Sequence, residues 1–221
     1  MCQAGGLTPP LSPATAKSLK NHKKCPIFLL LIPSFSIIPV RSILASLTRR
    51  QPGTAVVLHQ FQQRYTAYKA RLERFLLSVL RRRLPRSVYD PIRYVMAGGG
   101  KRLRAVLTLV SCEAAGGSPN DALHAAAAIE LLHNFTLVHD DVMDNAPLRR
   151  NRATVHTRWD TNTAILAGDE MVALAFEALH RSNGGASKEI VRVFTRAFID
   201  VCEGQGMDKE FETRRDVTVA E

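Results

Sequence analysis

Three carboxylates are gathered at one point of the chain, where Asp140, Asp141 and Asp144 stand within five residues. On a helix, Asp140 and Asp144 would lie about 40° apart on one face, with Asp141 on the flank. Like charges at this spacing repel, and acids near a helix C-terminus oppose the helix dipole, so a purely solvated helix end is disfavoured. We expect a compensating cation, and Mg²⁺ fits because one or two carboxylates hold it together with substrate phosphate oxygens.

A glycine turn upstream of this cluster leads directly into basic residues. Gly98–Gly100 are followed by Lys101, Arg102 and Arg104. Backbone amides at a helix start, together with lysine and arginine, suit a diphosphate. The turn is not a Walker loop, because Arg102 occupies the position where Ser or Thr would follow the lysine. The residues therefore predict a second phosphate pocket beside the acidic metal site.

Two arginines and one histidine extend this chemistry around the aspartates. Arg149 and Arg150 follow closely after Asp144, and guanidinium forks match the geometry of phosphate. His133 stands seven residues before Asp140, which is two helical turns to within roughly 20°, so the two side chains share a face. A histidine in such an apolar stretch is also typical of a helical core, and the residues alone leave both roles open.

The elements that must carry these residues are predicted to be helices. From Phe61 to Leu80 the apolar residues recur every three or four positions, which is the period of one helix face. Asp90 has the character of an N-cap before Pro91, and Gly98 would end that short helix. No segment alternates apolar and polar residues as a strand does. We expect an all-α fold, with further helices over about 102–115, 118–144, 162–182 and 187–211.

The basic excess of the chain lies in its N-terminal third. The 221 residues include 30 Lys and Arg against 20 Asp and Glu, and 46% of them are hydrophobic, which suffices for a buried core. The first acidic residue is Glu73, and residues 1–72 hold ten basic side chains, which is the whole net charge of +10. The rest is balanced, so we expect no nucleic-acid binding. Four cysteines without a C-x-x-C pair favour the reduced cytoplasm.

Residues 1–56 form a basic, acid-free extension that we expect to be disordered or non-native, and residues 57–221 are expected to form the folded domain. The apolar run from Ile27 to Val40 is too short to span a bilayer. A signal or transit peptide is the alternative interpretation of the extension. Membrane contact through it stays open.

The residues at the other end of the chain indicate a continuation. Positions 218–221 have the form T-x-x-E, the capping box that begins a helix. A helix is not stable from its first turn alone, because nucleation is unfavourable. We therefore expect that the sequence has been cut at Glu221.

Taken together and in order, these motifs resemble those of the trans-isoprenyl diphosphate synthases, also called the polyprenyl synthetase family. The resemblance covers roughly Phe61 to Glu221. It implies an isoprenoid-synthase-type helical bundle, which would be incomplete at its C-terminus here. The motifs that carry it are G-G-K-R-L-R at Gly99–Arg104, D-D-x-x-D at Asp140–Asp144, the pair Arg149-Arg150, T-V-H at Thr154–His156, Gly168-Asp169, and G-Q-x-x-D at Gly204–Asp208.

The resemblance also implies a reaction and a role for each site residue. Asp140 and Asp144 would bridge magnesium ions on an allylic prenyl diphosphate, with Asp141 in support and Arg149 on the same diphosphate. The allylic diphosphate would leave, the double bond of isopentenyl diphosphate would attack the resulting carbocation, and a proton would depart. The residues that would bind isopentenyl diphosphate are Lys101, Arg104, His133 and Arg150.

Further implications concern product length, assembly and activity. A bulky Phe135 beneath the aspartates would limit chain growth to farnesyl or geranylgeranyl diphosphate, and Gln205 and Asp208 would line the same cavity. Relatives are usually homodimers, and the resemblance implies the same for this chain. In relatives a second aspartate-rich motif lies beyond the position of Glu221, so we expect this polypeptide by itself to be inactive or unstable. The alternative function is that of a non-catalytic homologue that binds and regulates a complete synthase. Departures from the family pattern are Ala105, Asn151 and Ala153, where relatives usually have proline, glycine and proline.

Overall fold

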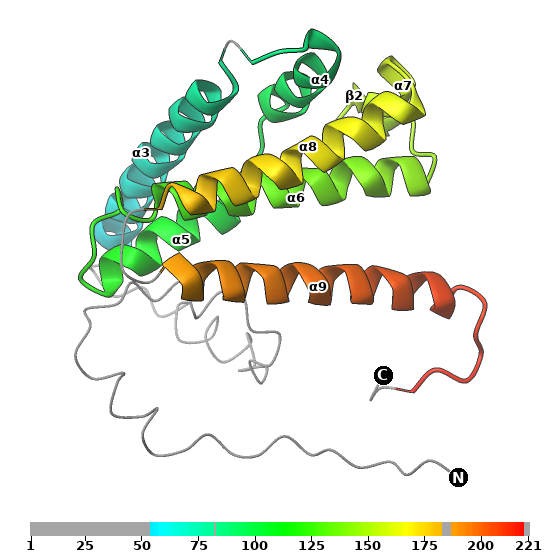
Figure 1. The fold of residues 1–221 in the computed structure, drawn as a ribbon. Coiled ribbons are helices and arrows are strands. Elements are labelled where there is room, and N and C mark those ends of the chain that lie inside the picture. Colours follow the sequence, from blue (N-terminus) through cyan, green and yellow to red (C-terminus); the bar gives the residue numbers. More distant parts are fainter. Residues whose placement is uncertain (1–53, 82, 183–186, 219–221) are drawn as a thin grey trace.

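The chain folds as a bundle of α-helices with one short hairpin (Figure 1). The computed structural model describes residues 54–81, 83–182 and 187–218. The expected all-α class is confirmed. In chain order the elements are α3 (Thr54–Leu80), α4 (Arg86–Ala97), α5 (Leu103–Ala114), α6 (Leu123–Met143), β1 (Leu148–Arg149), β2 (Arg152–Ala153), α7 (Val155–Arg158), α8 (Thr161–His180) and α9 (Ser187–Phe211).

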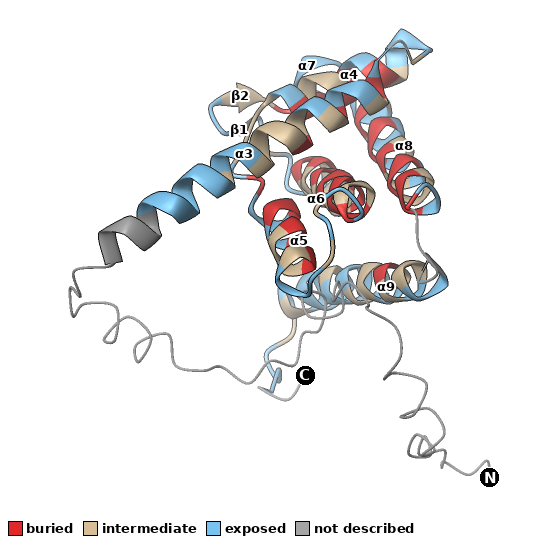
Figure 2. Ribbon diagram, turned by 90° about the vertical axis from the view of Figure 1, so that its left-hand side faces the viewer, coloured by how far each residue is buried: buried red, intermediate tan, exposed pale blue. Residues whose placement is uncertain are grey.

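Helix α6 lies at the centre of the bundle, with α3, α5 and α8 packed against it (Figure 2). The alanine run Ala125–Ala128 of α6 is buried, and α8 contributes Ala164 and Ala167 to the same core. Side chains this small allow two helix backbones to approach closely. Gly168 of α8 makes room for the ring of His139, because a Cβ atom there would collide with it. Helix α6 is therefore held firmly along the length that carries the candidate site.

Helix α4 begins earlier than the sequence predicts. The prediction that Asp90 caps a helix is wrong, because α4 starts at Arg86 and Pro91 lies inside it. A proline in a helix interior removes one backbone hydrogen bond. Tyr89 and Ile92 are both buried on either side of Pro91, and we attribute the continued helix to this burial. Gly98 follows the last helical residue, as predicted.

The other long helices follow their predicted ranges closely. α3 starts at Thr54, three residues before the expected domain start. After its last residue, Arg83 Nε donates to the Val79 carbonyl at 2.9 Å, where a cation also stabilises the helix dipole. Helix α6 begins five residues later than predicted, because residues 118–122 form a turn closed by the Asp121 amide on the Ser118 carbonyl at 2.9 Å. Residues 1–53 and 219–221, which include most of the expected extension and of the capping box, lie outside the described residues.

A small hairpin after α6 was not predicted. Leu148 of β1 pairs with Ala153 of β2 in an antiparallel register, and each strand has two residues, too few for an alternating pattern. The chain reverses at Arg150 and Asn151, whose φ angles are 53° and 61°. Asparagine adopts this left-handed conformation more readily than most residues, which explains how Asn151 can occupy this turn.

Helix α9 is the most peripheral long helix of the described part. It packs on α8, where Phe194 is buried against Phe176 with ring centroids 5.4 Å apart. Most of its residues beyond Val201 are exposed (Figure 2). Within the described residues, no helix is both long and apolar enough to cross a membrane.

Candidate functional site

The three aspartates lie at the C-terminal end of α6, as predicted. Asp140 is half-buried, Asp144 is exposed and forms the C-cap of the helix, and Asp141 is 4% exposed. The Asp141 carboxylate accepts a hydrogen bond from Arg149 Nε at 2.6 Å. The carboxylates of Asp140 and Asp144 have no hydrogen bond or ion pair with another described residue. Two of the three acids are therefore available to a ligand.

The electrostatics of this helix end leave negative charge uncompensated. Burial raises the pKa of Asp140 above its usual value, and the neighbouring Asp144 raises it further, while Arg149 acts in the opposite direction. Burial also raises the pKa of Asp141, against the hydrogen bond from Arg149. Raised pKa values mean that the ionised forms are disfavoured here. A cation bound at this end of α6 would relieve that cost.

The donor set fits Mg²⁺ held partly by a ligand. Among the described residues, no group of three or more His, Cys, Asp or Glu side chains is arranged to hold a metal ion. Mg²⁺ does not need such a cage, because it binds through one or two carboxylates and keeps its remaining positions for water and phosphate oxygens. Asp140 and Asp144 would supply those carboxylates.

The glycine turn between α4 and α5 adopts a left-handed backbone and is contacted by the hairpin. Gly99 and Gly100 have φ angles of 69° and 137°, which glycine adopts without steric cost. Arg150 Nη1 donates to the Gly99 carbonyl at 2.6 Å, and a Cβ atom at Gly100 would lie 2.7 Å from the same nitrogen. A side chain at position 100 would therefore displace the Arg150 guanidinium and strain the backbone.

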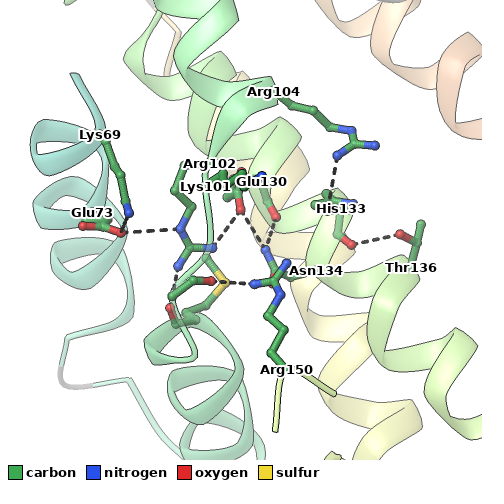
Figure 3. Close-up of polar contacts among 12 residues, drawn as sticks. Lys69, Glu73, Lys101, Arg102, Arg104, Glu130, His133, Asn134, Thr136 and Arg150 are labelled. Carbon is green, nitrogen blue, oxygen red and sulfur yellow. Dashed lines mark hydrogen bonds and ion pairs between the residues drawn. The ribbon is translucent and has the colours of Figure 1, made fainter. Parts of the chain in front are cut away.

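The three cations that follow the turn have different roles. Arg102 is 5% exposed, and its guanidinium donates to Glu130 Oε1 at 2.7 Å and to the Met96 carbonyl at 2.5 Å. Figure 3 shows it between Glu73 of α3 and Glu130 of α6. Lys101 and Arg104 remain exposed. The sequence suggested that all three cations could bind a phosphate group, but in the structure only Lys101 and Arg104 are accessible to such a ligand.

His133 joins the basic turn, which the sequence left open. Arg104 Nη1 lies 3.4 Å from His133 Nε2 (Figure 3). Burial lowers the pKa of His133, and the positive charge of Arg104 lowers it further. The imidazole is therefore neutral at pH 7, with one nitrogen able to donate a hydrogen bond and the other able to accept one. Helix α6 thus carries both the histidine of the basic pocket and the aspartates of the acidic end.

A small cavity of about 50 Å³ lies between α4, α6 and the hairpin. Asp141, Arg149 and Arg150 line it, together with Asn134 of α6. Asn134 also donates to Glu130 Oε1 at 3.2 Å. Glu130 and Asn134 were not predicted as site residues. Their pattern was visible as two polar residues four apart in an otherwise apolar helix, which places them on one face.

The residues expected to limit product length lie on α9 or in contact with it. Phe135 packs against His139 and against Phe198 of α9, with ring centroids 4.6 Å and 5.6 Å apart. Gln205 is half-buried and Asp208 is exposed, both on α9. None of the three lines the cavity described above. Their role in product length stays a prediction.

Known proteins with similar sequences and folds support the interpretation of these motifs. A sequence model of the family described as polyprenyl synthetase matches residues 85–221. A geranylgeranyl pyrophosphate synthase of Geoglobus acetivorans is 47% identical over 146 residues, covering 65% of this chain and 46% of that protein. A short chain isoprenyl diphosphate synthase of Methanothermobacter thermautotrophicus is 45% identical over 139 residues, covering 62% of this chain and 42% of that protein.

A solved structure gives the same result for the fold. A crystal structure of a geranylgeranyl pyrophosphate synthase superimposes with a TM-score of 0.68 and 44% sequence identity. The match covers 71% of this chain and 48% of that one. The matched part of this chain thus corresponds to less than half the length of each of these three relatives.

Proposed function

The chain belongs to the polyprenyl synthetase family, and from that membership we propose that it serves the magnesium-dependent condensation of isopentenyl diphosphate with an allylic prenyl diphosphate. The observation that carries this proposal is the layout of α6. The helix presents the unpaired carboxylates of Asp140 and Asp144 at its end, and two turns earlier it presents His133 to Arg104. One rigid helix thus links a candidate metal site to a candidate diphosphate site.

The basic side chains would bind the diphosphate of the attacking substrate. Lys101 and Arg104 are exposed cations at the start of α5, and Arg150 approaches the same turn from the hairpin. Charge-assisted hydrogen bonds from such groups are stronger than neutral ones. His133, held neutral by burial and by the neighbouring arginines, would add a hydrogen bond without adding charge. This pocket would hold isopentenyl diphosphate in place for attack.

The acidic end would bind the departing group. Asp140 and Asp144 would hold Mg²⁺, which when bound neutralises charge on the allylic diphosphate. Arg149, fixed by Asp141, would place a guanidinium beside the same group. In the reaction the allylic carbon–oxygen bond breaks with its electron pair on the diphosphate, the double bond of isopentenyl diphosphate forms the new carbon–carbon bond, and a proton is released.

The proposal extends to a short-chain product, a homodimer and a cytoplasmic location. The support for product length is the bulk of Phe135, which fills the space between α6 and α9. In a catalytically active form, Phe135→Ala should yield longer prenyl products, and unchanged products would contradict this assignment. Sedimentation of the purified chain tests the dimer, and fractionation of expressing cells tests the location.

Binding is the first test of the function, because it depends on the described site. Isothermal titration of the 221-residue chain should show isopentenyl diphosphate binding with or without Mg²⁺. The non-reacting analogue geranyl thiodiphosphate should bind only when Mg²⁺ is present. Absence of binding by both ligands would refute the proposed function. Binding of both without condensation of the natural substrates agrees with the expected inactivity of this polypeptide by itself, whereas stable association with a complete synthase would favour the alternative, a binding or regulatory homologue.

A further inference from the structure

The backbone of the basic turn, which we define as residues 98–104, is intrinsically unfavourable. Gly99, Gly100 and Arg102 all have positive φ angles, and that of Arg102 is 52°. A left-handed conformation is costly for a residue with a side chain. The turn therefore needs restraints from neighbouring elements if it is to present Lys101 and Arg104 in one arrangement.

Two of these restraints come from residues already described. Arg102 is fixed through its side chain by Glu130 and by the Met96 carbonyl, and Gly99 is fixed through its carbonyl by Arg150. Neither restrains the backbone of Lys101 directly. That restraint comes from α3, where the Tyr65 hydroxyl donates a hydrogen bond to the Lys101 carbonyl.

The space between α3 and the turn is not completely filled. A cavity of about 260 Å³ separates them further along α3, lined by Glu73 and Leu77 on one side and by Gly99 and Arg102 on the other. Across it, Arg102 Nε lies 3.8 Å from Glu73 Oε1, and this buried nitrogen has no hydrogen-bond partner among the described residues. This cavity leaves the turn incompletely packed against α3, so the Tyr65 hydrogen bond is a direct restraint on the position of Lys101.

We propose that Tyr65 is a positioning residue for Lys101, and that its hydroxyl raises the affinity of the basic turn for the diphosphate of isopentenyl diphosphate. This inference rests on the proposed function. Tyr65 lies outside residues 85–221, the segment that the sequence model of the family matches. Tyr65 acts through the Lys101 backbone, by narrowing the conformations of the residue that carries the ammonium group.

The chain offers a matched control on the same helix. Tyr68 stands three residues after Tyr65, and its hydroxyl donates to Glu113 Oε2 of α5 at 2.6 Å. Tyr68→Phe removes the same atom and one hydrogen bond between α3 and α5, but it does not touch the basic turn. Any effect that comes from looser docking of α3 should appear in both variants.

The experiment compares the full chain with its Tyr65→Phe and Tyr68→Phe variants. Isothermal titration measures the dissociation constant of isopentenyl diphosphate, and hydrogen exchange measures the protection of the amides of residues 101–104. Tyr65→Phe should weaken binding about three- to tenfold, the range expected for one hydrogen bond, and should speed exchange in the turn. Tyr68→Phe should leave both unchanged, and both variants should bind geranyl thiodiphosphate with Mg²⁺ as the wild type does.

The outcomes separate this inference from the proposed function. Equal weakening in both variants, or none in Tyr65→Phe, would overturn the positioning role. If the wild type binds no isopentenyl diphosphate, the proposed function fails, and the inferred effect on affinity fails with it. Hydrogen exchange then still tests whether Tyr65 restrains the Lys101 backbone, since unchanged protection of the turn in Tyr65→Phe would show that it does not.

Discussion

The basic turn and the acidic end of α6, residues 140–144, differ in how their charged side chains are paired. In the basic turn, Arg102 forms a buried ion pair with Glu130, and Arg104 contacts His133. At the acidic end, only Asp141 has a partner, and Asp140 and Asp144 have none among the described residues. The charges of the first region are paired within the protein, whereas the second region leaves the carboxylates of Asp140 and Asp144 unpaired among the described residues.

This difference has a physical origin in the cost of burying charge. A buried charge is tolerated when it is paired and hydrogen-bonded, and Arg102 meets that condition with a side-chain exposure of 2%. Asp140 and Asp144 at the end of α6 are closer to solvent, so their carboxylates can remain unpaired at a smaller cost. The pKa values follow this division, because burial and arginines lower that of His133, while burial and Asp144 raise that of Asp140.

The largest expected effect comes from breaking the buried pair of the basic turn. Glu130→Ala removes the nearer counter-ion of the buried Arg102 guanidinium and leaves only Glu73, whose Oε1 lies 3.8 Å from Arg102 Nε, so it should cost about 3 kcal/mol of unfolding free energy. Urea unfolding followed by circular dichroism measures it. The control is Glu177→Ala, which breaks the more exposed pair with Arg83 and should cost about 1 kcal/mol or less. Equal losses would show that the Arg102 pair has no special structural role.

The next largest effect is a loss of Mg²⁺-dependent ligand affinity at Asp140 and Asp144, which should leave binding at the basic turn unchanged. Asp140→Asn or Asp144→Asn removes a carboxylate that would hold Mg²⁺. Affinity for geranyl thiodiphosphate with Mg²⁺ should fall by at least the roughly 10- to 100-fold that loss of an outer partner costs a metal site. Isopentenyl diphosphate should bind as before. Asp121→Asn, at an exposed turn, is the control, and a loss of the same size there would point to net charge as the cause.

A third variant tests the one paired acid at the end of α6. Arg149→Ala leaves the Asp141 carboxylate, which is 4% exposed, without its hydrogen bond from Arg149. The loss should be about 1–3 kcal/mol of unfolding free energy. Because burial already raises the pKa of Asp141, the loss should be greatest at neutral pH and smaller near pH 4. A loss independent of pH would contradict the role of this pair.

The smallest effect is an opposite pH dependence of stability in the two regions. The lowered pKa of His133 means that the unfolded chain binds more protons than the folded chain just below pH 6.5. The stability that the neutral His133 side chain contributes is therefore lost as pH falls through that range. The raised pKa of Asp140 means that the folded chain binds more protons just above pH 3.8, so stability falls as pH rises there.

Two substitutions separate these contributions. His133→Gln should flatten the melting-temperature profile near pH 6, whereas Asp140→Asn should flatten it near pH 4 and raise the melting temperature slightly at pH 7. Thermal melts from pH 3.5 to 8 measure both. A lower melting temperature of Asp140→Asn at pH 7 would contradict the view that the unpaired acid is a cost to the apo chain.

Most of the helices could be predicted because their information is local. The apolar period of α3 and the glycines that follow α4 and α5 depend on neighbouring residues only. The start of α4 could not be predicted, because burial of Tyr89 and Ile92 overrides the local preference at Pro91. The hairpin was missed because two-residue strands have no periodicity, although its arginines were recognised as site residues.

The sequence by itself determined which chemistry is present and on which helix it lies. The spacing of His133, Asp140 and Asp144 fixes their common side of α6, because helical geometry is the same in any context. Only the tertiary structure decided which cations stay accessible. Arg102 is indistinguishable from Lys101 and Arg104 as a string of basic residues, and it becomes structural because the fold brings Glu130 of α6 to it across the core. Pairing between distant residues depends on packing, and no local pattern of the chain encodes it.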